Sequence, residues 1–205
     1  MEHGSDATIC KLSRAYELKQ QREELRQTQE IMDLQKDEMR SQNKSIRRQA
    51  FETTFLRTLE LHSDIVSRVS LGQNSNKREG REAFMYMAKQ SADGDPRTGY
   101  AKMYKTNEAE LGHYFRTLYN LIRYIDEHGH EQRAMYSRLV RAQLSRWEVE
   151  LLFYNGLSKH GEKFKPLIEK YSLLKHLSED SSLNNHRDEY DANAFERNAK
   201  RPETV

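Results

Sequence analysis

The sequence predicts an all-α protein in which a long N-terminal, coiled-coil-like helix leads into a compact helical bundle. The 205 residues contain only three prolines and nine glycines, so residues that break helices are rare. No segment alternates β-branched and polar residues as a half-buried strand would. Charged residues make up 32% and hydrophobic residues 36%, which is polar for a compact domain, so the chain is either elongated or partly disordered.

Residues 1–48 form the predicted stem, a charged segment without proline whose last glycine is Gly4. Apolar side chains recur at seven-residue intervals, as at the d positions of a heptad repeat: Leu18, Leu25, Met32, Met39 and Ile46. The corresponding a positions are mostly polar: Ala15, Arg22, Gln29, Lys36 and Asn43. Two-stranded coiled coils prefer Ile or Val at a, so two interpretations stay open. The stem is either a homo-oligomerising coiled coil or a single long helix, packed along its own domain or partly frayed.

Residues 49–177 are the predicted bundle, and the polar residues 178–205 are the predicted tail, loosely attached or disordered beyond about Phe195. The first helix continues into the bundle with a wider apolar face and ends near Gly72, where a polar loop over residues 73–78 begins. A short helix is predicted at Glu82–Gln90, and a loop follows at Ser91–Gly99. Two further helices are predicted, at about residues 100–127 and at Glu131–Leu144.

Ser145 and Glu148 match a capping box at the start of the following helix. In this motif the serine hydroxyl accepts a hydrogen bond from the third amide of the helix, and the glutamate reaches back to the serine N–H. We therefore expect a helix boundary at Ser145 and a new helix to about Leu157. A further helix is predicted at Phe164–Leu177, with Pro166 in its first turn.

The central helices carry polar residues that packing alone does not require. The helix of residues 147–157 is apolar on nearly all sides, as is typical of the middle of a bundle, yet it includes Glu148 and Asn155. Gln143 lies on the apolar arc of the preceding helix. A buried amide or carboxylate costs about 1–3 kcal/mol or more unless it is paired. We therefore expect a buried polar seam that serves either packing specificity or function. Its members are His113, Arg116, Asn120, Arg141, Gln143, Glu148 and Asn155.

The alternative for one helix is a solvated face. Four of its polar residues lie opposite its apolar arc, at steps of three and four residues: His113, Arg116, Asn120 and Arg123. On this interpretation, they face water and do not contribute to a seam.

A metal-independent ribonuclease of the HEPN type is the alternative activity. Such helical enzymes use an Arg-x4–6-His motif, in which histidine acts as general acid or base and arginine stabilises phosphate charge. Arg123 and His128 have this spacing and are the weak catalytic candidates. Chance matches are expected in a chain with eight histidines, and Asp126 and Glu127 would repel an RNA backbone.

The sequence predicts no cofactor and no metal site. Glu127, His128 and His130 could ligate a metal, but histidines at a helix end often only cap carbonyls. The formal charge of +2 does not indicate nucleic acid as a partner. Cys10 is the single cysteine and cannot form an internal disulfide. No apolar run is long enough to cross a bilayer, so we expect a cytoplasmic protein.

Several stretches resemble the putative phage abortive infection family typified by AbiC. They are Gly112–Arg116, Leu118–Tyr119, Tyr124–Ile125, Arg141–Ser145 with Glu148, and Leu152–Asn155, flanked by similar stretches at Phe51–Val66 and Phe164–Tyr171. The resemblance implies a bacterial antiphage protein that halts phage multiplication at the infected cell's expense. Its relatives commonly carry membrane-spanning segments ahead of the charged stem. We therefore expect this chain to be either the cytosolic part of such a protein or a soluble variant.

The expected function is a helical sensor or effector module that contacts a phage or host protein, with its valency set by self-association of the stem. The alternatives are the ribonuclease and a coiled-coil scaffold without antiphage activity.

Overall fold

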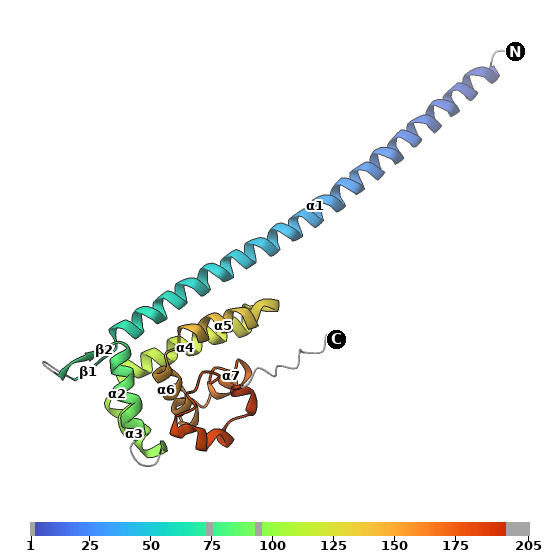
Figure 1. The fold of residues 1–205 in the computed structure, drawn as a ribbon. Helices are drawn as coiled ribbons and strands as arrows, with labels where there is room; N and C mark the ends of the chain where they lie inside the picture. The colour runs from blue at the N-terminus through green and yellow to red at the C-terminus, as the bar shows by residue number, and fades with distance from the viewer. Residues whose placement is uncertain (1–2, 73–75, 93–95, 196–205) are drawn as a thin grey trace. The chain divides into compact units, whose positions relative to one another are not determined.

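A computed structural model describes residues 3–72, 76–92 and 96–195 of the chain (Figure 1). The long N-terminal helix α1 (His3–Arg68) leads into a helical bundle, and the strands of the described part form only one short hairpin, so the predicted fold class is confirmed. The chain divides into two compact units, Met1–Ala50 and Phe51–Val205. In the described ranges, no helix has both the length and the apolar character needed to span a membrane.

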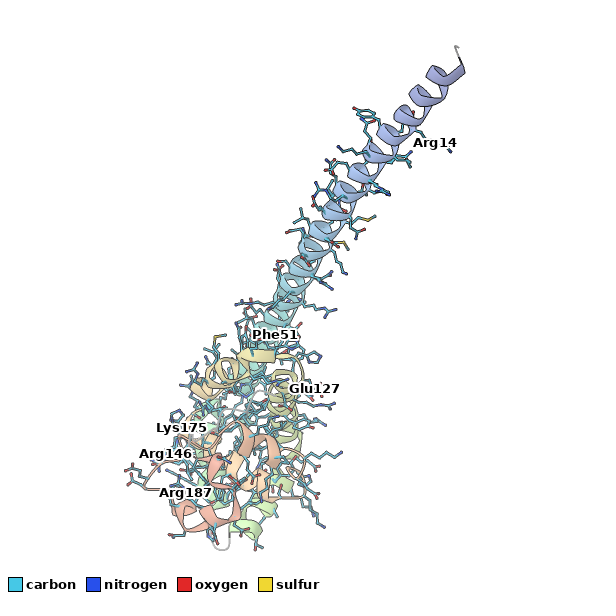
Figure 2. All side chains as sticks on the ribbon, turned by 90° about the vertical axis from the view of Figure 1, so that its right-hand side faces the viewer. Arg14, Phe51, Glu127, Arg146, Lys175 and Arg187 are labelled. Atoms are coloured by element: carbon cyan, nitrogen blue, oxygen red, sulfur yellow. The ribbon has the colours of Figure 1, made fainter. Side chains whose placement is uncertain are left out.

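The first unit is the N-terminal part of α1. Its side chains from residue 16 onward point away from the helix on all sides and are exposed (Figure 2). The predicted heptad stripe is exposed with them, with Leu25 at 69% and Ile46 at 62%. Ion pairs along the helix surface join Arg26 to Glu23 at 2.6 Å and to Glu30 at 2.5 Å. Such exposed pairs contribute only about 0.3–0.5 kcal/mol each, so they support the helix weakly.

The second unit begins at Phe51, where α1 acquires a buried face (Figure 2). Its further helices are α2 (Arg81–Ser91), α3 (Pro96–Thr106), α4 (Glu108–His128), α5 (Arg133–Gln143), α6 (Arg146–Leu157) and α7 (Lys165–Lys170). The described part also contains the 3₁₀ helices η2 (His130–Gln132), η3 (Ser182–Glu189) and η4 (Ala192–Ala194). Helix α6 contacts α2, α3, α7 and η3, and its residues 148–156 are all buried. It is therefore the central helix that its apolar composition predicted.

A short β-hairpin follows α1 where the sequence predicted more helix and a loop. Strand β1 (Ser70–Leu71) pairs antiparallel with β2 (Arg78–Glu79), and α1 ends at Arg68. Gly72 has φ +80°, and a Cβ there would lie 2.6 Å from the Asn76 carbonyl oxygen. Gly72 is therefore a turn residue of the hairpin, and its predicted place at the end of the helix was wrong.

Helices α3 and α4 replace the single helix predicted over about residues 100–127. α3 already begins at Pro96, inside the predicted loop, because proline is well tolerated in the first turn of a helix. The break lies at Asn107, whose side-chain amide donates to the Met103 carbonyl at 2.9 Å. The Met103 carbonyl also accepts from the Asn107 backbone N–H at 3.2 Å, and at Asn107 the backbone leaves helical geometry, with φ −118° and ψ 26°.

The C-terminal segment packs more closely than the sequence predicted. Helix α7 ends at Lys170, well before Leu177, and turns follow it. The Tyr190 hydroxyl donates to the Phe153 carbonyl at 2.7 Å, and both Tyr190 and Phe195 are buried. Leu183, Tyr190 and Phe195 of the predicted tail are therefore part of the core, and the disorder predicted beyond Phe195 falls outside the described residues.

Candidate functional site

A buried hydrogen-bond network joins α4 to α6. The Tyr114 hydroxyl donates to Glu148 Oε1 at 3.1 Å, and both side chains have no exposed surface. Glu148 Oε2 accepts from the Ser145 backbone N–H at 2.8 Å and from the Ser145 hydroxyl at 2.6 Å. The Ser145 oxygen in turn accepts from the Glu148 N–H, which completes the predicted capping box. One carboxylate thus caps α6 and binds α4.

The protonation state of Tyr114 makes this network stable at neutral pH. Burial raises the pKa of the Tyr114 phenol well above its usual value, and the Glu148 carboxylate raises it further. The phenol therefore keeps its proton and can act as the donor to Glu148.

His62 on α1 lies next to this network without a polar partner. Its ring centroid is 5.2 Å from that of Tyr114, and the side chain is only 1% exposed. In the described part of the chain, neither ring nitrogen has a hydrogen-bond partner. Burial lowers the pKa of the imidazole to about 4, so His62 is neutral at pH 7. A buried polar group of this kind costs about 1–3 kcal/mol.

His62 also forms part of the wall of an open cavity of about 490 Å³. The rim carries Arg81 and Glu79 from the start of α2 and from β2, and Gln143 from the end of α5. Ser63, next to His62, contributes to the same wall. The cavity therefore combines a neutral imidazole with both signs of charge and with groups that form hydrogen bonds.

The predicted polar seam is not formed by the expected partners. His113, Arg116 and Asn120 are exposed on α4, and Gln143 is exposed at the cavity rim. Three other members are buried, namely Arg141, Glu148 and Asn155. The prediction of buried polar groups was thus right for these three, and the prediction that they pair with the histidine and arginine of α4 was wrong.

The buried polar groups have tyrosine hydroxyls and backbone carbonyls as their partners instead of the histidine and arginine of α4. Asn155 Nδ2 donates to the Tyr100 hydroxyl at 3.0 Å. The Arg141 guanidinium donates to the Ser172 carbonyl at 3.2 Å, where Ser172 has a positive φ of 51°. Tyr100 and Tyr114 were the residues that sequence reasoning missed. The available signal was a tyrosine on an apolar helical face, because a buried phenol usually needs a polar partner.

The two residues of the predicted ribonuclease motif are occupied in other ways. Arg123 Nε donates to Glu127 Oε1 at 2.7 Å, and both side chains are about half exposed. The His128 ring stacks on the Tyr124 ring with centroids 4.8 Å apart. In this arrangement the Arg123 guanidinium is paired with the Glu127 carboxylate, and a phosphate of an RNA substrate would have to compete with that carboxylate. The geometry therefore gives the catalytic hypothesis no support.

The acidic and histidine residues form no metal centre in the described ranges. No group of three or more His, Cys, Asp or Glu residues is arranged there to hold a metal ion.

The fold and the network together define a small helical bundle with a tyrosine–carboxylate core and a long charged N-terminal helix. Residues 106–182 match the family of putative phage abortive infection proteins, which confirms the family resemblance. The matched segment runs from the end of α3 into η3 and includes Tyr114, Glu148 and Asn155. Comparisons with curated proteins and with solved structures gave no match.

Proposed function

We propose that this chain is a bacterial antiphage protein of the abortive infection type, acting as a helical sensor or effector module through protein contact. The observation that carries the antiphage role is the family match over residues 106–182. Within this segment the buried side chains of Tyr114, Glu148 and Asn155 are paired inside the fold. They stabilise the bundle and leave recognition to the surface.

The proposed contact surface is the exposed row of α4 formed by His113, Arg116 and Asn120. These residues are three and four positions apart, so they lie on one side of the helix. Among the described residues, none of the three side chains makes a hydrogen bond or an ion pair. An arginine with its donors available is well suited to a protein interface, where arginine is enriched. A phage or host protein is the partner that we infer for this row.

A plaque assay tests this proposal with one triple variant. Bacteria expressing the wild-type chain are compared with bacteria expressing His113→Ala/Arg116→Ala/Asn120→Ala. We expect the wild type to reduce plaque formation and the triple variant to lose the protection. Because the three side chains are exposed, the free energy of unfolding should change by no more than about 0.5 kcal/mol. The melting temperature should therefore stay nearly unchanged.

The matched control is Arg138→Ala, which removes an exposed arginine from α5. It should protect as well as the wild type. A triple variant that protects fully would contradict the contact surface. A wild-type chain that gives no protection would contradict the antiphage role and favour a scaffold without it.

We further propose that the stem joins copies of the chain. Its stripe of Leu18, Leu25, Met32, Met39 and Ile46 recurs every seven residues and is exposed throughout. Burying this stripe against the same stripe of a second copy is favourable by roughly 25 cal/mol per Å² of apolar surface. The polar a positions would select register and copy number at a cost in stability.

A further inference from the structure

A second cavity lies between α3 and the end of α6. Its volume is about 430 Å³, within the range of roughly 300–1,000 Å³ that small-molecule sites occupy. Helices α3 and α6 contact each other, and the residues after α6 complete the wall. None of the residues argued above to contact a phage or host protein lines this cavity.

Aromatic rings form much of the wall. Tyr100 and Tyr154 are stacked, with centroids 5.7 Å apart and an angle of 14° between their planes. Tyr104 and His160 are stacked more closely, at 4.4 Å and 24°. His160 is exposed, although its ring packs on Tyr104. The wall thus offers ring surface for a planar ligand.

Two lysines bring positive charge to the same cavity. Lys105 from the last turn of α3 and Lys159 from the turn after α6 both line it, and both are exposed. Among the described residues, neither ammonium group has an ion pair or a hydrogen bond. The one carboxylate of the lining is Glu108, so cations outnumber anions there. The guanidinium of Arg116 is close enough to lower the pKa of Tyr104, although burial and Glu108 raise it overall.

The tyrosine wall is held in place from the core. The Asn155 amide donates to the Tyr100 hydroxyl at 3.0 Å. Gly161 allows the following turn to approach Asn155, since a Cβ at Gly161 would lie 2.0 Å from the Asn155 carbonyl oxygen. Burial raises the pKa of Tyr154 to about 12, so its phenol is neutral and can donate. The cavity is therefore built from fixed side chains, and its charged groups stand at the surface.

We propose that this cavity binds a nucleotide, with the base against the Tyr104–His160 stack and the phosphate paired with Lys105 and Lys159. Aromatic rings bind any base through its π face, and lysines bind phosphate as point charges. A free mononucleotide and the end of a single-stranded nucleic acid present the same chemistry. This inference does not depend on the antiphage role.

Calorimetric titration of the full chain tests the proposal with adenosine monophosphate, adenosine, inorganic phosphate and a hexaadenylate RNA. We expect the monophosphate or the RNA to bind, and adenosine and phosphate alone to bind at least about 10-fold more weakly, because each offers only half of the contacts. If adenosine monophosphate binds more tightly than the RNA, the ligand of the cavity is a free nucleotide. If the RNA binds more tightly, the ligand is the end of a single strand.

The decisive variant is Lys105→Ala/Lys159→Ala, which removes both phosphate partners. It should weaken binding by about 10-fold or more, since two charge-assisted contacts are lost. The control Lys163→Ala/Lys175→Ala removes the same charge from exposed lysines outside the cavity lining and should bind like the wild type. His160→Ala should weaken the binding of adenosine monophosphate but leave the weak binding of inorganic phosphate unchanged. The proposal is overturned if neither probe binds at millimolar concentration, or if Lys105→Ala/Lys159→Ala binds like the wild type.

Discussion

The hydroxyl of Tyr114 donates a hydrogen bond to the carboxylate of Glu148, 34 residues further along the chain, and both side chains are fully buried. This bond ties α4 to the central helix α6 within the segment that matches the family. Because the same carboxylate closes the capping box with Ser145, one side chain fixes both the start of α6 and its contact with α4.

Tyr114→Phe should destabilise the bundle by about 1–3 kcal/mol, because it leaves a carboxylate oxygen buried without its partner. For a unit of this size the loss corresponds to a melting temperature lower by roughly 5 °C in circular dichroism. Tyr124→Phe is the matched control, since Tyr124 stacks on Phe51 and among the described residues its hydroxyl has no hydrogen bond. Equal melting of the Tyr114→Phe protein and wild type would show that the bond adds nothing to stability.

Glu148→Ala should cost more than Tyr114→Phe. It removes the acceptor of Tyr114 and of the Ser145 N–H and hydroxyl, so buried donors lose their partner. We expect a loss of about 3 kcal/mol or more, measured by urea unfolding. Glu148→Gln keeps an oxygen acceptor and should lose less. If Glu148→Ala unfolded at the wild-type urea concentration, the network would not stabilise the fold.

His62 should make the bundle less stable in mild acid. The unfolded imidazole takes up a proton near pH 6.5, whereas the folded one stays neutral until about pH 4. Protons therefore favour the unfolded state, and stability falls as the pH drops from about 6.5 to 4. The full loss is about 3 kcal/mol, because each unit of pKa difference is worth about 1.4 kcal/mol. Urea unfolding at several pH values measures it.

His62→Leu tests whether this imidazole is the cause, because it removes the imidazole and leaves the charged groups of the neighbouring cavity, Glu79 and Arg81, in place. The variant should be more stable than wild type at pH 5 and should lose the slope between pH 6.5 and 4. It should also match or exceed the wild type at pH 7, because it replaces a buried unpartnered group with an apolar one. An unchanged pH profile would mean that another group titrates in this range.

Leu25→Lys/Met32→Lys should abolish self-association of the stem. Both residues lie on the heptad stripe, and a charged side chain there opposes burial against a second copy. Light scattering after size-exclusion chromatography should give an oligomer for the wild type and a monomer for the variant. The control Ile31→Lys/Leu34→Lys adds the same charge at exposed positions off the stripe and should remain oligomeric. A monomeric wild type would contradict the proposed role of the stem.

Local signals in the sequence predicted much of the fold. The capping box at Ser145 and the apolar surface of α6 depend on neighbouring residues, and the structure has both. The seven-residue spacing of the stripe was visible in the sequence, whereas its exposure in the single chain was left open there. The hairpin was missed because strands of two residues carry no periodic signal. The break between α3 and α4 lies at the single residue Asn107, and the composition of the segment does not reveal it.

The candidate site was predicted less well, because its contacts are distant in sequence. Burial of Glu148 and Asn155 followed from the apolar helix around them. Their partners, Tyr114 and Tyr100, were counted as apolar, although each carries a hydroxyl that satisfies a buried group. His62 packs against Tyr114, and the Tyr190 hydroxyl bonds to the Phe153 carbonyl. Both contacts join segments that are distant in the sequence, and a helical wheel does not describe such packing.

The most direct test of the proposed function is the number of phage released per infected cell, counted together with the survival of those cells. The account predicts that cells with the wild-type chain die on infection and release few phage, and that His113→Ala/Arg116→Ala/Asn120→Ala restores a normal phage yield. A normal yield from cells with the wild-type chain would contradict it.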